Sequence, residues 1–290
     1  MQFILADIDR REWATLGRER FEREYVSPLR PVVIAGGFDG WAARHKWTLQ
    51  FFSEKHGSRP VVVDGKRWRL DDLIDQIRSS SSEAPAPYLR NQLLARWPAE
   101  LLADISPMPE CTRPNWLESR AIPVVQPLTY VELFIGGAGA RFPVLHYDNL
   151  HTHAYLMQLF GEKEYVALAP DQGRFLYPQE GMASNQSSID DLDHPDPARF
   201  PLFDQAKGIR FRLRPGETLF VPAGWWHTVR ILSASITVSI NGANRANWPA
   251  FRKDFVEDRA RTSPWRARLM KPYMLALGAL LMLESLLDVF

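Results

Sequence analysis

The residues best suited to chemistry stand in one short stretch, FPVLHYDNLHTH, at positions 142–153. His146 and Asp148 are two positions apart, and in a β-strand such residues point to the same face. A third ligand comes from RPGETLFVPAGWWHTV, where His227 follows a predicted strand, 81 positions after His146. Two imidazoles and one carboxylate on one side of a metal leave the opposite positions open, which suits Fe(II) oxygenases. The spacing therefore predicts a metal site at these three residues.

Two other sets of residues compete with this assignment. His151 and His153 could join His146 in a three-histidine site, although the carboxylate that such sites usually place a few residues later is absent. A second His-x-Asp pair, His194 and Asp196, lies in an acidic, proline-containing segment that is typical of a loop. No GxSxG nucleophile elbow occurs, so a serine hydrolase is poorly supported. The residues alone leave these alternatives open.

Short strands must position the candidate ligands. From about residue 122 to residue 241, short apolar or alternating runs are separated by clusters of Gly, Pro and Asp, as in β-sandwiches and barrels. The preceding region mixes short strands with helices, predicted at 32–34, 49–55, 61–63 and 70–77. From Trp248 onward the pattern is helical. We therefore expect a mixed helix and strand region, a β core and C-terminal helices, at residues 1–120, 121–244 and 245–290 respectively.

Composition limits the classes of function. With 290 residues, 46% hydrophobic and 24% charged, the chain is long enough to bury a large core. A formal net charge of +1 gives no global reason to expect DNA or an anionic membrane as the main partner. The single cysteine, Cys111, cannot form an internal disulfide, and the N-terminus lacks the pattern of a secretory signal. We therefore expect a cytoplasmic protein that does not bind DNA.

Several ordered motifs resemble one family. The matching segments are YVSPLRPVVIAGGFDGWAARHKWTLQFF, HYD, GEKEYVALAPDQGRFLYP, RPGETLFVPAGWWHTV and SITVSIN. Together they resemble the JmjC-type, cupin-like 2-oxoglutarate oxygenases, and they are close in pattern to asparaginyl hydroxylases of the factor-inhibiting-HIF type. The resemblance implies a double-stranded β-helix (jelly-roll) core, with Fe(II) held by His146, Asp148 and His227. It also implies 2-oxoglutarate and dioxygen as cosubstrates. In the implied reaction, 2-oxoglutarate is oxidatively decarboxylated to succinate while a C–H bond is hydroxylated.

The resemblance also assigns roles around the cosubstrate. Lys163, in GEKEYVAL, matches a lysine that pairs with the distal carboxylate of 2-oxoglutarate, which suits an ammonium partly shielded from water. Tyr88 matches a tyrosine whose hydroxyl reaches the same carboxylate. Asn241 matches an asparagine near the cosubstrate and the iron. Without the resemblance, a surface lysine, a half-buried tyrosine and a strand-end asparagine would be the plainer interpretations.

One cosubstrate contact departs from the family. Pro143 stands where the family has a threonine that touches 2-oxoglutarate. That contact is therefore missing or is supplied elsewhere, with Thr129 or Tyr130 as candidates.

The substrate side departs further. Asn185 stands where the relatives have an arginine, and Gln186 matches the glutamine that follows it; there the pair grips the substrate amide. Leu150 replaces another polar substrate contact, while Tyr147 and Trp225 could form an apolar wall. We therefore expect a hydroxylase of a protein or peptide side chain. An oxygenase of a small metabolite or of a modified RNA base, and a non-catalytic binding module, are the alternatives.

The C-terminal region carries an uncharged run, YMLALGALLML, at positions 273–283. A membrane span needs about 20 apolar residues, so we expect this run to be buried against protein rather than to cross or lie on a membrane. Its leucines recur at helical spacing around most of the circumference. Relatives use such helices to dimerise, and we predict a homodimer whose interface buries Leu277, Leu280 and Leu281.

Overall fold

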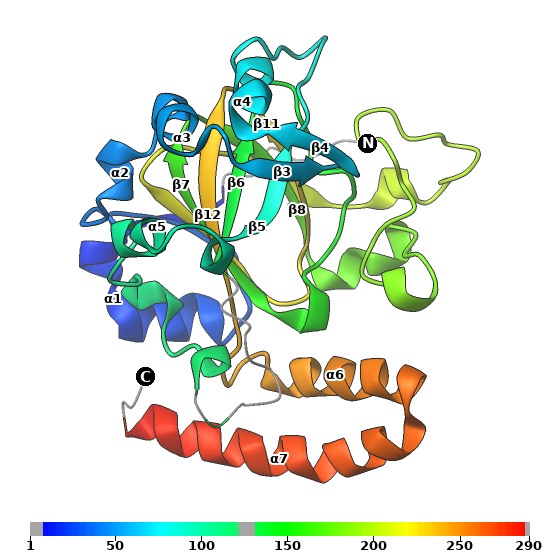
Figure 1. The fold of residues 1–290 in the computed structure, drawn as a ribbon. Coiled ribbons are helices and arrows are strands. Elements are labelled where there is room, and N and C mark those ends of the chain that lie inside the picture. Colours follow the sequence, from blue (N-terminus) through cyan, green and yellow to red (C-terminus); the bar gives the residue numbers. More distant parts are fainter. Residues whose placement is uncertain (1–7, 120, 122–130, 288–290) are drawn as a thin grey trace.

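Two facing sheets form the centre of the computed structural model, which describes residues 8–119, 121 and 131–287 (Figure 1). The strands are β1 (Arg10–Glu12), β2 (Val32–Ala35), β3 (Pro60–Val63), β4 (Lys66–Arg69), β5 (Leu89–Leu93), β6 (Val131–Gly136), β7 (His153–Phe160), β8 (Lys163–Leu168), β9 (Gly208–Leu213), β10 (Glu217–Val221), β11 (Trp226–Ile231) and β12 (Ser235–Gly242). The large sheet has the order β1-β2-β10-β7-β12-β6-β5, and the small sheet β11-β8-β9. The predicted double-stranded β-helix core is confirmed.

Side chains of the large sheet alternate between its two faces. In β6, Leu133 and Ile135 belong to the main hydrophobic core, whereas Glu132 and Phe134 point toward the small sheet. Strands β7 and β12 follow the same period of two, which brings to the inner face Ala154, Leu156, Ser239 and Asn241. The outer face is thus apolar and covered, while the inner face mixes polar and apolar groups around a space between the sheets.

Helices of the first 120 residues cover the outer face of the large sheet. They are α1 (Trp13–Phe21), α2 (Ala43–Lys46), α3 (Leu49–His56), α4 (Leu70–Arg78) and α5 (Ala99–Asp104). Their apolar faces join those of the sheet in one core, which holds Phe21, Trp47, Phe52 and Leu73. The strands and helices predicted for this region are present at the expected places.

The N-terminal region is continuous with the core rather than separate from it. Strands β1, β2 and β5 form the two edges of the large sheet, and β3 with β4 makes a two-stranded sheet of its own. Short 3₁₀ segments join the main elements at Leu94–Arg96, Glu110–Thr112, Trp116–Glu118, Asn149–His151, Pro170–Phe175, Gly181–Ala183 and Phe203–Gln205, and a π-helical turn spans Glu22–Val26.

Two C-terminal helices, α6 (Trp248–Thr262) and α7 (Pro264–Leu286), lie side by side beneath the sheets (Figure 1). One face of α7 packs on its own chain, where Leu277 and Leu281 join Trp248 and Phe251 of α6 in a hydrophobic cluster. The prediction that a subunit interface buries Leu277 and Leu281 is therefore wrong, because the chain itself buries both. Leu280 differs, with 45% of its surface exposed.

The opposite face of α7 is apolar and uncovered. Its exposed side chains include Trp265, Leu269, Leu280, Leu283 and Leu286. The helix has 23 residues, and its most apolar window has a mean hydropathy of 1.4 with 17% of that window buried. By length and composition, α7 is thus also long enough to cross a membrane, although a single such helix is weak support for one.

Candidate metal and cosubstrate site

The three predicted metal ligands lie together. One ligand atom from each of His146, Asp148 and His227 falls within 4.8 Å of the others. Nε2 of His227 is 3.9 Å from Oδ2 of Asp148, and the two imidazole rings have centroids 4.5 Å apart. Within the described ranges, no other group of three such side chains has this geometry. The separation leaves room for one ion between the three side chains.

Backbone pairing fixes the two histidines relative to each other. The amide of His146 donates to the carbonyl of His227 at 3.1 Å, and the amide of His227 donates to the carbonyl of His146 at 2.6 Å. His227 is the second residue of β11, so this reciprocal pair extends the small sheet by one bridge. Strand pairing therefore fixes the positions of the two histidine ligands relative to each other.

Both imidazoles are held in the form that binds a metal. Nδ1 of His146 lies 3.2 Å from the carbonyl oxygen of Val144, and Nδ1 of His227 lies 3.1 Å from that of Trp225. Because a carbonyl oxygen only accepts, each Nδ1 carries the proton and each Nε2 keeps its lone pair. Burial, with the neighbouring His227, lowers the pKa of His146 to about 3. The His146 ring is therefore neutral, and its Nε2 lone pair is available to a metal.

The carboxylate completes the fit to a divalent cation. Burial raises the pKa of Asp148 above its usual value, because a buried anion without a close cation is costly. A bound Fe(II) would remove that cost. Two neutral nitrogen donors and one carboxylate are the donor set that suits this ion, and they leave its other positions free for ligands.

Lys163 and Tyr88 lie at the other end of the same cavity. The Lys163 ammonium donates to the Tyr88 hydroxyl at 2.9 Å, and both side chains are buried. Among the described residues, no carboxylate is within ion-pair distance of Lys163, and burial lowers its pKa to about 7. An uncompensated ammonium beside a hydroxyl fits an anionic ligand such as the distal carboxylate of 2-oxoglutarate.

Strand pairing sets the separation between this ammonium and the metal ligands. In the β8–β11 pair, Lys163 stands opposite Ile231 and His227 stands opposite Ala167.

The turn that leads into β8 is tight, since Gly161 has φ of 68° and a Cβ there would lie 1.9 Å from the carbonyl oxygen of Ala234. A glycine is thus required two residues before the lysine.

The cavity between the sheets has about 510 Å³ of empty space, counted to its opening. Asn241 lines it, as predicted from the resemblance, and donates through Nδ2 to Oγ1 of Thr152 at 3.3 Å. Ser239 also lines the cavity, so a further hydroxyl is present although Pro143 lacks one, whereas Thr228 turns its hydroxyl toward the carbonyl oxygen of Phe142 at 3.4 Å. Reasoning from the sequence missed Ser239. For Ser239, its place two before Asn241 in a strand was the available signal.

The alternative substitute for the Pro143 position stays open. Thr129 and Tyr130 lie outside the described residues. Ser239 is the serine or threonine hydroxyl that the described cavity offers instead.

A groove lies beside the loop that carries Asp148, although none of the three metal ligands lines it. It has about 1360 Å³ of empty space and is lined by Tyr147, Asn149, His151, Ser184 and Gln186 on one side and by α6 residues on the other. Tyr147 and Asn149 flank Asp148 in the chain, and the backbone of Gln186 bridges to His146. Three of the predicted substrate residues, Tyr147, Asn185 and Gln186, thus line one groove next to the segments that carry the metal ligands.

Asn185 and Trp225 are each held by hydrogen bonds within the protein. Asn185 is buried, and its Nδ2 donates to the carbonyl oxygen of Tyr147 at 2.7 Å and to Oδ1 of Asn149 at 2.9 Å. Its amide hydrogens therefore hold the loop around Asp148. Trp225 lines neither the cavity nor the groove, because its indole N–H donates to the carbonyl oxygen of Leu29 at 2.8 Å.

The competing histidines have other partners. His153 is buried, accepting through Nδ1 from the amide of Ala223 at 3.0 Å, while its Nε2 faces Oδ1 of Asn244 at 3.3 Å. His151 pairs with Asp254 of α6 at 2.5 Å. His194 is 86% exposed at its side chain, in contact with Asp191. The three-histidine site and the second His-x-Asp site are therefore absent from the described structure.

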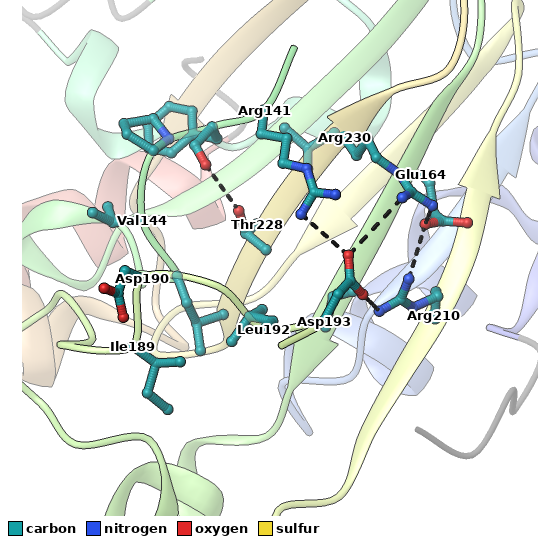
Figure 2. Close-up of a pocket in the computed structure, with 15 residues that line it drawn as sticks. Arg141, Val144, Glu164, Ile189, Asp190, Leu192, Asp193, Arg210, Thr228 and Arg230 are labelled. Carbon is teal, nitrogen blue, oxygen red and sulfur yellow. Dashed lines mark hydrogen bonds and ion pairs between the residues drawn. The ribbon is translucent and has the colours of Figure 1, made fainter. Parts of the chain in front are cut away.

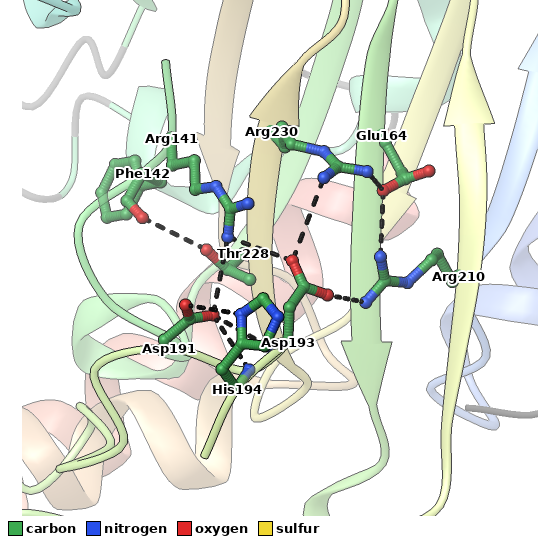
Figure 3. Close-up of polar contacts among 9 residues, drawn as sticks. All are labelled: Arg141, Phe142, Glu164, Asp191, Asp193, His194, Arg210, Thr228 and Arg230. Atoms are coloured by element: carbon green, nitrogen blue, oxygen red, sulfur yellow. Dashed lines mark hydrogen bonds and ion pairs between the residues drawn. The ribbon is translucent and has the colours of Figure 1, made fainter. Parts of the chain in front are cut away.

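A network of charges fastens the segment after Gln186 to the small sheet (Figures 2 and 3). Asp193 contacts Arg210 at 2.6 Å and Arg141 at 3.1 Å. Glu164 of β8 contacts Arg230 of β11 at 2.7 Å and Arg210 at 3.2 Å. Burial alone would raise the pKa of Asp193. The hydrogen bond from Arg210 and the neighbouring guanidinium charges outweigh burial and hold this pKa below its usual value.

This network surrounds a pocket of about 480 Å³ on the outer face of the small sheet (Figure 2). Its arginines and carboxylates pair with one another. These ion pairs therefore hold the segment around Asp193 against the small sheet and leave no free charge among the described residues for a ligand in this pocket. The fastened segment follows directly after Asn185 and Gln186 in the chain. The outer network therefore helps to position one wall of the groove lined by Tyr147 and Gln186.

The fold and the site together define a class of protein: a cupin-type barrel with a two-histidine, one-carboxylate metal site and a buried lysine in the cosubstrate cavity. The sequence profile of the cupin-like domain matches residues 18–242, and the chain belongs to this JmjC-type, cupin-like family. Enzymes of the family use Fe(II), 2-oxoglutarate and dioxygen. The described residues fit the first two of these.

Three relatives illustrate the range of the family. The chain is 28% identical over 232 residues to lysine-specific demethylase 8 of Xenopus tropicalis, 25% over 262 residues to the bifunctional arginine demethylase and lysyl-hydroxylase psr-1 of Caenorhabditis elegans, and 26% over 249 residues to tRNA wybutosine-synthesizing protein 5 of Gallus gallus. These matches cover 76%, 83% and 77% of this chain, and 50%, 64% and 73% of the relatives. The chain spans about half the length of the first relative. The narrower resemblance to asparaginyl hydroxylases stays a prediction.

Proposed function

We propose that the protein is an Fe(II)- and 2-oxoglutarate-dependent hydroxylase of a protein or peptide side chain. The observation that carries the proposal is the single cavity with His146, Asp148 and His227 at one end and Lys163 with Tyr88 at the other. A ligand that bridges these ends must bind a metal through one group and present a carboxylate at the other. 2-Oxoglutarate meets both requirements.

Each part of the chain then has a defined task. When bound, the metal and dioxygen would supply the oxidising power that inserts oxygen into a C–H bond, with 2-oxoglutarate as the reductant that leaves as succinate and carbon dioxide. The three ligands hold the metal on one side, while Lys163 and Tyr88 orient the far carboxylate. Phe134 and Leu156 line the cavity with apolar surface and limit the access of water. The substrate carbon must be presented from the open side, where Tyr147 and Gln186 lie.

The groove beside the metal ligands supports a polypeptide substrate. The groove is open to solvent and lies between the segments at 147–151 and 182–186 and α6, so it can take an extended stretch of chain beside Tyr147 and Gln186. The charged residues that line it are mixed in sign: Lys253 and Arg261 against Asp254, Glu257 and Asp258. An RNA-binding groove would need an excess of cations along the backbone path. A relative that makes wybutosine in tRNA keeps the modified-base alternative in view.

Mass spectrometry separates the two substrates. We would incubate the protein with Fe(II), ascorbate and 2-oxoglutarate, and with either a peptide library or total tRNA. The proposal predicts peptides that gain one oxygen, with succinate formed in step. Oxygen incorporation into tRNA nucleosides, with none into peptides, would favour the modified-base alternative.

We also infer a homodimer through the uncovered face of α7. Leu269, Tyr273, Ala276, Leu280 and Leu283 follow one another at intervals of four, three, four and three residues. This is the heptad spacing by which helices pair, and it lies on the face opposite Leu277 and Leu281. A second copy offers the same apolar stripe, which would cover both. A membrane surface is the competing occupant.

A further inference from the structure

Glu132 is a carboxylate in the iron cavity that the proposed reaction does not use. It lies on the inner face of β6 and lines the cavity together with Asp148 and Phe134. Within the described residues, no lysine, arginine or histidine pairs with it. Its one polar contact there is the side-chain amide of Asn91, whose Nδ2 donates to Oε2 at 3.3 Å.

The backbone around Asn91 is shaped to reach this carboxylate. The register of β5 against β6 shifts between Leu89 and Gln92, which marks a bulge in the edge strand. Asn91 lies inside the bulge with φ of 54°, in the left-handed region that asparagine tolerates better than most residues. Such bulges re-aim side chains beside active sites. Here the bulge directs an amide to Glu132.

Charge balance gives this carboxylate a consequence for the substrate. Two positive charges from Fe(II) and one from Lys163 offset Asp148 and the two carboxylates of 2-oxoglutarate. Glu132 then remains as one uncompensated negative charge in a partly buried position. Burial, with a contribution from Asp148, raises its pKa, as expected for an anion that lacks a cation. A substrate group that brings a positive charge would remove this cost.

We propose that Glu132, positioned by Asn91, is the residue that selects a cationic side chain, of the arginine or lysine type, for hydroxylation. The inference rests on the proposed function. It adds that the substrate group is positively charged and that Glu132 recognises this charge. Oε1 of Glu132 has no partner among the described residues, so it can accept from a guanidinium or an ammonium. A neutral side chain would leave it unpaired, which disfavours binding.

The test is a binding measurement under nitrogen, with Fe(II) and 2-oxoglutarate saturating. Fluorescent glycine-rich peptides that differ in one central residue, Arg, Lys, Gln or Leu, would be titrated and followed by anisotropy. We expect the Arg or Lys peptide to bind roughly tenfold to a hundredfold tighter than the Gln peptide. The comparison of the two cationic peptides tells which cation is preferred.

Variants assign the preference to Glu132. In Glu132→Gln the ratio of affinities for cationic and neutral peptides should fall close to one, and in Glu132→Lys a peptide with central Glu should become the tightest. Asn91→Gly keeps the positive φ but removes the amide, so the ratio should fall partway. Glu19→Gln, on an exposed side chain, is the matched control and should retain the wild-type ratio.

Two results would overturn the inference: equal affinities of wild type for cationic and neutral peptides, or an unchanged ratio in Glu132→Gln. The failure of the proposed function looks different, because it would appear as absent succinate formation with every peptide. A protein that turns over 2-oxoglutarate but prefers neutral peptides would keep the proposed function and refute the role of Glu132.

Discussion

His146 and His227 exchange both of their backbone hydrogen bonds, amide to carbonyl in each direction, at 3.1 and 2.6 Å. Two of the three metal ligands are therefore held by the same interaction that holds strands together. Metal sites on flexible loops lack this property, because their ligands must be ordered by the ion itself. Here the backbone itself holds two of the three ligands in place.

Removal of the metal should therefore leave the fold intact. We predict that treatment with a chelator preserves the far-ultraviolet circular dichroism spectrum. Mn(II), a redox-stable probe, binds only the folded state. At a hundred times its dissociation constant it should raise the free energy of unfolding by about 2.7 kcal/mol and so raise the melting temperature. His227→Ala should lose this metal-dependent shift. Unfolding upon chelation would show that the metal organises the sheet.

Loss of the buried ammonium should weaken cosubstrate binding. Charge-assisted hydrogen bonds contribute about 1.5 to 3 kcal/mol, so Lys163→Ala should reduce the affinity for 2-oxoglutarate roughly tenfold to a hundredfold. Metal affinity should change far less, because Lys163 lies at the other end of the cavity. Calorimetric titration measures both, with the exposed Lys207→Ala as control. An unchanged affinity for 2-oxoglutarate in Lys163→Ala would remove the lysine from the site.

The same lysine predicts a pH dependence. Burial lowers the pKa of Lys163 to about 7, so the ammonium is charged below that pH and must take up a proton to bind the anion above it. The affinity for 2-oxoglutarate should therefore fall as pH rises from 7 to 9, approaching about tenfold per pH unit. Lys163→Arg should flatten this profile, because arginine stays protonated. A wild-type affinity that is constant or rises over this range would contradict the assignment.

The exposed stripe on α7 predicts the assembly. Leu283→Arg places a charge on an exposed position, 57% accessible, and should convert a dimer to a monomer without loss of fold. Leu281→Arg is a poor test, since Leu281 is fully buried in its own chain and the charge would destabilise that cluster. Light scattering coupled to gel filtration reads the mass. A monomeric wild type that floats with liposomes would show that the stripe binds lipid.

The sequence predicted the cluster of His146, Asp148 and His227 and the barrel, but spacing alone left a three-histidine alternative open, and the resemblance to a family chose between them. The His-x-Asp spacing puts two ligands on one face, and the period of two in β6 and β12 predicts which residues point inward. Leu277 and Leu281 show the limit of such rules. Helical spacing indicates that these leucines are buried, but only tertiary packing decides whether the chain itself or a second copy buries them.

Glu132 and Asn185 show a second limit. Glu132 alternates with apolar residues as any solvent-facing strand residue would, and its place beside Asp148 arises from the closure of two sheets. Asn185 matches a substrate-binding position of the family, yet its amide hydrogens are used to hold Tyr147 and Asn149. Neither outcome is available from spacing, because each depends on contacts between residues more than 12 positions apart.

The central claim is that His146, Asp148 and His227 hold an iron that acts with 2-oxoglutarate. Succinate formation by the purified protein, measured with Fe(II) and 2-oxoglutarate but without substrate, tests it most directly. We predict slow, iron-dependent turnover in wild type and in the exposed His194→Ala control, and none above background in His146→Ala, Asp148→Ala or His227→Ala. Turnover in His227→Ala at the wild-type rate, or its equal loss in His194→Ala, would contradict the account.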